Sequence, residues 1–350
     1  CKIDAKNYTK NHPIDINILL KGLNDNIQTS VAWDNNSDNK YCGNISINTS
    51  FYKIDKTIPE SRIQILPTDI VINDTIWNIY ESNITLNPNK ININNLKLGN
   101  RDKHIIIDGK VSDQIEDSIK INLKEIDLEY VFDIINFHPV DFAGYATGNA
   151  YIANIKASPE LQANLKVRSF TFNKAHLGNM NLLGGWNKEK NTIHLNAHIT
   201  DYKNNSTTNV NGEVRLGAPP KGGLDLMIRT NNIDLYFLNK YTSGIFTNLN
   251  GRASGWTRVF GPFKGINLEG DMFINKANLK INATNVDYHV LNDSVILRPG
   301  KIIFKNARIY DKYGRPNLSS HYGVVNGYLQ HHYLSQMTYN IDVDTYNILG

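Results

Sequence analysis

Residues 118–124 read Ser-Ile-Lys-Ile-Asn-Leu-Lys, so that apolar and polar side chains alternate strictly. A period of two places Ile119, Ile121 and Leu123 on one face of a β-strand and the polar residues on the other. The alternation recurs along almost the whole chain, for example at residues 14–18, 91–93, 193–195, 224–228 and 337–343. Helical spacing is scarce, and its best candidates are Leu128 to Phe137 and a short segment near Leu235 to Tyr241. We therefore expect an all-β protein whose antiparallel sheet has one apolar and one wet face.

Turn-forming sequences interrupt the alternation. Residues of this type favour tight turns because they tolerate or impose unusual backbone angles. They predict connections between strands at Asn87-Pro88-Asn89, Asp108-Gly109, Asn211-Gly212, Arg298-Pro299-Gly300 and Asn326-Gly327.

Comparison of the sequence with itself reveals a repeat. Ile126-Asp127-Leu128 returns 107 residues later as Ile233-Asp234-Leu235 and, 110 residues after that, as Val343-Asp344-Thr345. Each copy follows an Asp-Gly or Asn-Gly pair and an alternating strand, and Gly144-Tyr145-Ala146-Thr147-Gly148 matches Gly251-Arg252-Ala253-Ser254-Gly255. We expect modules at residues 81–137 (partial), 138–245 and 246–350 (truncated), after an N-terminal stretch of amphipathic strands at residues 1–80.

One module cannot cover its own apolar face, so neighbouring modules are expected to continue the same sheet. This predicts an elongated, repetitive antiparallel sheet of roughly 20–25 strands with one or two short helices. A sheet that curls on itself forms a groove (a β-taco), whereas a sheet that folds over and packs on itself forms a closed sandwich. The alternation alone does not distinguish these two architectures. The groove-lining candidates are Ile84, Leu86, Ile91, Ile93, Ile105, Ile107, Ile119, Ile121, Leu123, Ile193, Leu195, Leu224, Leu226, Ile228, Ile302 and Phe304. The expected bends of the sheet are at Gly144, Gly148, Gly251 and Gly255.

Residues that carry chemistry are sparse. The formal net charge of +4 over 350 residues supplies no basic stripe for nucleic acid. His331 and His332 are neighbours on a strand, so they point to opposite faces and cannot readily share one metal ion with His321. Asp342 and Asp344 share a face, but no nucleophile or further acid or base accompanies them. We expect no catalysis, no metal and no cofactor.

The ends of the sequence suggest an internal piece of a longer polypeptide. The chain begins with Cys1 rather than Met and stops at Gly350 within a continuing pattern. The second cysteine is Cys42, and the sequence neither requires nor excludes one disulfide between the two. No apolar run approaches the roughly 18–20 residues of a membrane span. Any anchor or targeting signal is expected outside this segment.

The repeat elements resemble the TamB family, the translocation and assembly module of the AsmA-like superfamily, in its Bacteroidetes-type form. The resemblance rests on Leu291 to Gly314, on the segment from Gly323 to Gly350, on Asn250 to Ile281, and on a weaker copy from Phe142 to Leu177. It implies a periplasmic β-taco with an apolar interior, anchored to the inner membrane through a segment absent here. It further implies phospholipid acyl chains as cargo, a TamA-type outer-membrane barrel as partner through regions outside this segment, and a role in outer-membrane biogenesis.

Three functions follow as hypotheses. The first is transport of phospholipid between inner and outer membrane along the apolar groove. The second is a scaffold that assists translocation and assembly of outer-membrane β-barrel proteins by adding their strands to its sheet. The third is an extracellular adhesive or carbohydrate-binding β-solenoid, although the sequence shows no array of aromatic platforms.

Overall fold

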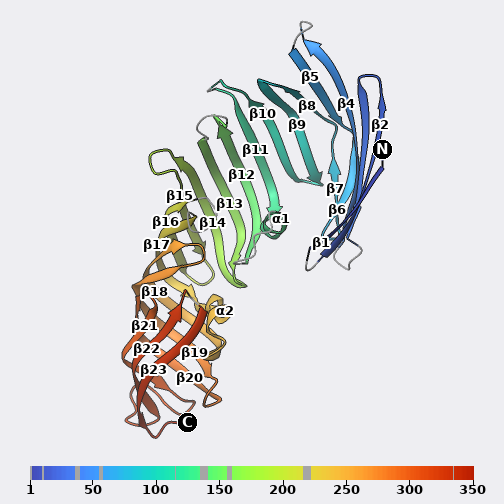
Figure 1. The fold of residues 1–350 in the computed structure, drawn as a ribbon. Helices are drawn as coiled ribbons and strands as arrows, with labels where there is room; N and C mark the ends of the chain where they lie inside the picture. The colour runs from blue at the N-terminus through green and yellow to red at the C-terminus, as the bar shows by residue number, and fades with distance from the viewer. Residues whose placement is uncertain are drawn as a thin grey trace. The chain divides into compact units, whose positions relative to one another are not determined.

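The computed structural model describes residues 2–9, 12–35, 40–54, 58–114, 116–134, 141–155, 160–215, 222–333 and 335–350. The described part of the chain is all-β, with antiparallel strands and short helical segments (Figure 1). The strands up to the first helix are β1 (Lys2–Thr9), β2 (His12–Leu23), β3 (Asn26–Asp34), β4 (Tyr41–Ile54), β5 (Ile58–Ile65), β6 (Thr68–Ile72), β7 (Thr75–Ile79), β8 (Ser82–Asn87), β9 (Lys90–Asn100), β10 (Lys103–Val111) and β11 (Ser118–Asp127). Then follow α1 (Leu128–Ile134), β12 (Phe142–Ala153), β13 (Glu160–Phe172), β14 (Ala175–Asn187), β15 (Thr192–Asp201), β16 (Ser206–Arg215) and β17 (Gly223–Asp234). The remainder is the 3₁₀ helix η1 (Leu235–Leu238), α2 (Asn239–Thr242), β18 (Phe246–Pro262), β19 (Asn267–Ile281), β20 (Val286–Arg298), β21 (Lys301–Tyr310), β22 (Tyr322–His332) and β23 (Ser335–Tyr346).

The chain divides into two compact units. Unit 1 comprises Cys1–Ile135 and Tyr145–Leu165, and unit 2 comprises Asn136–Gly144 and Lys166–Gly350. The two units are defined by contacts within the folded chain, whereas the repeat modules expected from the sequence are defined by sequence similarity. The boundaries of those modules therefore stay a prediction. Both expected helices are confirmed: the first is α1, although residues 135–137 of the expected helix lie outside the described residues, and the second is η1 followed by α2.

In unit 1 the strands pair in chain order except between β4 and β9. There, two short strand pairs lie side by side: β5 pairs with β8, and β6 pairs with β7. β4 pairs with both β5 and β6, and β9 with both β7 and β8. Pro67 stands between β5 and β6, where it has no N–H for the ladder. In effect, two long strands are each broken once.

In unit 2, β14 to β23 form a simple meander in which each strand pairs with the next. Hairpins of this kind bring sequence neighbours together and fix the register along the whole run.

The repeat seen in the sequence returns as repeated local geometry. In β11 the register shifts between Leu123 and Ile126, and in β17 it shifts between Thr230 and Ile233, 107 residues later. The bulged residues Glu125 and Asn232 both have positive φ, at 52° and 61°. The backbone N–H of Glu125 donates to Thr147 Oγ1 at 3.0 Å.

The corresponding bond joins the N–H of Asn232 to Ser254 Oγ at 2.9 Å. Asp127 and Asp234 then start the helices, since their Oδ1 atoms accept from the N–H of Glu129 (3.1 Å) and Tyr236 (2.9 Å). The strand–bulge–helix element is therefore a structural repeat as well as a sequence repeat.

Three of the five turn predictions are wrong. Asn87-Pro88-Asn89 and Arg298-Pro299-Gly300 do form turns between strands, but the pairs at 108–109, 211–212 and 326–327 lie inside β10, β16 and β22. A Cβ on Gly109, Gly212 or Gly327 would come within 2.0–2.1 Å of a carbonyl oxygen of the adjacent strand. Glycine is needed at these positions because two backbones approach closely, not because the chain turns.

Candidate functional site

In unit 1, strand register gathers the predicted groove-lining residues of that unit onto one face of the sheet. Paired positions in an antiparallel ladder point to the same face. Ile84 pairs with Ile93 and Leu86 with Ile91. The same face continues across the next strands.

On β10 and β11, Ile105 pairs with Leu123 and Ile107 with Ile121. Ile119 pairs with Gly109, which in turn pairs with Ile93 of β9. All nine residues predicted between positions 84 and 123 thus belong to one apolar face, which we call the unit 1 face.

The unit 1 face extends beyond the residues that were expected individually from the sequence. Across β2 to β5 most paired positions are again apolar, although Thr29 pairs with Ile47 and Thr49 with Ile63, and β9 and β12 add further members. The additional residues are Ile16, Ile18, Val31, Ile45, Ile47, Ile63, Ile65, Leu96, Leu98, Ala150 and Ile152. Alternation predicts most of them. Leu96 and Leu98 are the exception: Asn95 has a φ of 49°, and the irregularity there shifts the phase of β9.

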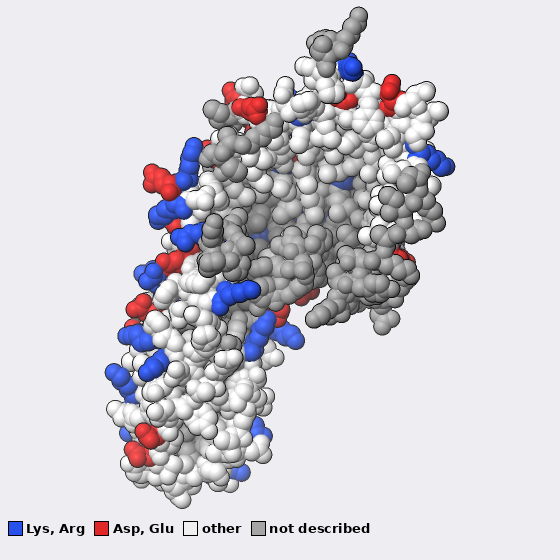
Figure 2. All heavy atoms as spheres, in the orientation of Figure 1, with Lys and Arg blue, Asp and Glu red and all other residues white. Residues whose placement is uncertain are grey.

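The unit 1 face is only partly covered. Eight of its nine predicted residues are half-buried, and the ninth, Ile119, is buried with 8% of its surface exposed. In a sealed sandwich such side chains pack against a second layer and are buried. Figure 2 shows the surface between β9–β11 and β2–β4 hollowed and largely free of charged side chains. The unit 1 face is therefore an open, concave apolar surface.

One end of the unit 1 face is closed. Ile70, Trp77, Ile79 and Ile126 form a buried cluster. Tyr130 and Val131 of α1 pack against it, together with residues of the face that include Ile105 and Leu123. These two predicted lining residues thus border a packed plug, whereas Ile84, Leu86, Ile91 and Ile93 lie outside it. Sequence patterns do not reveal the plug, because α1 and the β6–β7 hairpin are distant in the sequence and meet only in the folded chain.

Unit 2 has an apolar face of its own. Ile193 pairs with Val214, which pairs with Leu224, and the neighbouring row joins Leu195 to Leu226 through Gly212. Ile228 follows on β17. All five predicted residues on β15 and β17 are half-buried.

Further along the meander, Ile302 of β21 lies between Leu297 and Leu329, both buried. Phe304 pairs with Val295 and is half-buried. Next to this face, η1 packs with Leu235 against Leu249 and neighbouring residues, forming a second helical plug like the one in unit 1.

The four glycines predicted as bends lie inside long strands, two in β12 and two in β18. Gly144, Gly148, Gly251 and Gly255 have φ between 131° and 150°. A Cβ on any of them would come within 2.9 Å of a carbonyl oxygen of the paired strand, and within 2.0 Å at Gly251. Each permits a backbone approach that another residue would prevent.

The polar candidates do not assemble into a site. His331 is buried and His332 exposed, as expected of adjacent residues on a strand, and burial lowers the pKa of His331. Asp342 and Asp344 are exposed on β23. Among the described residues, no group of three or more His, Cys, Asp or Glu could hold a metal ion. Cys42 is a free thiol, and Cys1 lies outside the described residues.

A polar residue that the sequence analysis missed is Asp311. It is completely buried, and it accepts hydrogen bonds from the backbone N–H of Tyr313 (2.8 Å), Gly314 (3.0 Å) and Leu349 (3.0 Å). Burial alone would raise its pKa, but these donors outweigh burial and the pKa lies below its ordinary value. Asp311 ties the segment after β21 to the end of the chain, which is a structural role.

Comparison with protein-family models, with curated proteins and with solved structures finds no match for this chain. No helix among the residues described is both long and apolar enough to cross a membrane.

Proposed function

We propose that the chain binds phospholipid acyl chains on its apolar sheet faces and carries them between membranes. The observation that supports this most is the unit 1 face, where Ile, Leu and Val side chains lie in register and remain half-exposed. Exposed apolar surface of this extent is a liability unless a ligand covers it.

The energetics favour long apolar ligands. Each methylene removed from water contributes about 0.8 kcal/mol, so several buried methylenes offset the cost of ordering a flexible chain. The face offers few directional polar groups, and selectivity among acyl chains is therefore loose. Head groups remain at the open side, in contact with water.

The cellular setting of the proposal comes from the resemblance to the TamB family. We place the chain in the periplasm, anchored to the inner membrane through a segment outside these residues, with a TamA-type barrel as its outer-membrane partner. In this setting the cargo serves outer-membrane biogenesis, and the chain acts as a conduit rather than an enzyme.

Photo-crosslinking in cells tests the proposal. A photoreactive amino acid at position 121 should capture phospholipid, whereas the same probe at position 120 should not, because Lys120 is exposed on the opposite face of β11. Positions 226 and 225 form the matched pair in unit 2, since Leu226 is half-buried and Asp225 exposed. Capture of unfolded barrel protein alone at positions 121 and 226 would refute lipid transport in favour of an assembly scaffold.

A further inference from the structure

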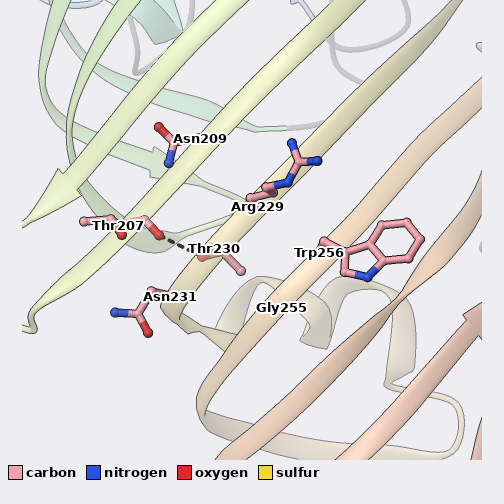
Figure 3. A pocket seen from close by; sticks show the side chains of 7 residues that line it. All are labelled: Thr207, Asn209, Arg229, Thr230, Asn231, Gly255 and Trp256. Carbon is pink, nitrogen blue, oxygen red and sulfur yellow. Dashed lines mark hydrogen bonds between the residues drawn. The ribbon is translucent and has the colours of Figure 1, made fainter.

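The polar face of unit 2 carries an open depression on β16, β17 and β18. Its lining includes Thr207, Asn209, Arg229, Asn231 and Trp256 (Figure 3). Asn209, Arg229 and Trp256 occupy directly paired positions on three successive strands. At about 4.8 Å per strand, the row spans about 10 Å.

Of the described residues that line this depression, Arg229 is the only lysine or arginine, and its side chain has no partner. Around it, Arg258 binds Asp225 through two bonds of 2.8 and 2.7 Å, and Lys190 binds Glu213 at 2.7 Å. Among the described residues, Arg229 makes no side-chain hydrogen bond, ion pair or ring contact. Its guanidinium therefore offers a planar pair of donors to an incoming anion.

The repeat provides an internal comparison. Counted back by 107 residues, Arg229 and Trp256 correspond to Asn122 and Asn149, which are likewise paired across β11 and β12. In unit 1 those two side chains bond each other at 2.7 Å. In unit 2 the equivalent positions hold an unpaired cation and a large aromatic ring in place of two asparagines that bond each other. The second copy of the repeat therefore has groups available for a ligand where the first copy has none.

We propose that this depression binds an acidic saccharide unit. The carboxylate of such a unit pairs with Arg229, while the C–H face of its ring lies on the indole of Trp256. Asn209 Oδ1 already bonds His198 Nδ1 at 2.7 Å, and Asn231 Oδ1 accepts from Ser254 Oγ at 3.3 Å. The NH₂ groups of the two amides therefore remain to donate hydrogen bonds to sugar hydroxyls. The site is separate from the apolar face of unit 2, because these side chains point to the other side of the sheet, and it stands whether or not that face carries lipid.

Binding of digalacturonic acid to the purified chain tests the assignment. Isothermal titration calorimetry measures the affinity of each variant, and the indole N–H signal of Trp256, followed by NMR in the unaltered chain, locates the ligand. The signal is assigned as the one missing from the Trp256→Phe variant. The double variant R229N/W256N serves as the matched comparison, because it installs the pair that the first copy of the repeat already holds. We expect a saturable shift for the unaltered chain and at least a 10-fold loss of affinity in the double variant, with an unchanged melting temperature.

Several results would overturn the proposal. They are an absence of any shift at about 10 mM saccharide, equal binding of neutral cellobiose, equal binding of inorganic phosphate or tetraglutamate, and unaltered affinity in R229N/W256N. Should the double variant melt early, Arg229→Gln alone provides the comparison: it keeps the polar chain and removes the charge, and retention of full affinity would refute the role of the guanidinium.

Discussion

Replacement of Ile121 by arginine tests whether the unit 1 face is open to solvent or part of a sealed core. Ile121 is half-buried on β11, paired with Ile107 on one side and Ala150 on the other. Complete burial of such a side chain is worth about 1.5–3 kcal/mol, so partial burial at this site contributes about 1 kcal/mol. The arginine stem covers part of the same surface, and its guanidinium reaches water on the open side.

Ile126→Arg is the control on the same strand. Ile126 is only 2% exposed and belongs to the buried cluster with Trp77 and Ile79. A charge forced into that cluster costs several kcal/mol, about 4 or more. We therefore expect Ile121→Arg to fold and Ile126→Arg to lose its cooperative melting or its soluble expression.

The assay combines thermal melting with binding of a fluorescent fatty acid. One kcal/mol corresponds to about 2–4 °C in a unit of 150–250 residues, so Ile121→Arg should melt within about 4 °C of the unaltered chain. Its affinity for the fatty acid should fall at least 10-fold, because the guanidinium would have to be desolvated beneath the acyl chain. Equal destabilisation by both substitutions would refute the open face, and unchanged fatty-acid affinity in Ile121→Arg would refute its role in binding.

Three further predictions concern the fold. Gly251→Ala should destabilise unit 2 by about 2 kcal/mol or more in thermal denaturation, because its φ of 135° and the carbonyl oxygen 2.0 Å from a Cβ both oppose a side chain. Gly244→Ala is the control, since a Cβ there has nothing within 4 Å and should change stability little; similar losses in both variants would contradict the close-approach argument. Thr147→Val and Ser254→Ala each remove the acceptor of a bulge N–H and should each cost about 1 kcal/mol in urea denaturation, and no cost in either variant would show that the repeated bond is incidental. The pKa of Asp311 in the folded chain lies below its unfolded value of about 3.9, so the stability that its carboxylate contributes is complete above about pH 4 and is lost as the pH falls through the folded pKa. Asp311→Asn should therefore be less stable at neutral pH and should lose less stability on acidification; parallel pH profiles of stability for the two chains would contradict the lowered pKa.

Alternation in the sequence was sufficient for the fold class and for most of the side chains that share a face. The pairing of Ile107 with Ile121 and that of Leu224 with Val214 both follow from a period of two once neighbouring strands form hairpins. Helical spacing predicted the two helical segments, and the repeat placed Asp127 and Asp234 at equivalent positions, where both segments begin. These features are local, and local sequence determines them.

Features that depend on contact between distant strands could not be predicted. Asp108-Gly109 has the composition of a turn, but the neighbouring backbone at Ser118 demands glycine in the middle of β10. The plug in unit 1 joins Trp77 to α1 across about fifty residues of sequence. Asp311 looks like a surface residue in the sequence, and its burial depends on donors from residues as far along the chain as Leu349.

Methyl NMR with a nitroxide-labelled phospholipid tests the acyl-binding face most directly. Ile121 and Ile93 lie on the unit 1 face, whereas Ile76 is 57% exposed on β7, where it precedes the inward-pointing Trp77. With the nitroxide in the acyl chain, the methyl signals of Ile93 and Ile121 should broaden strongly while that of Ile76 stays sharp. Equal broadening of all three signals, or broadening of Ile76 alone, would contradict the account.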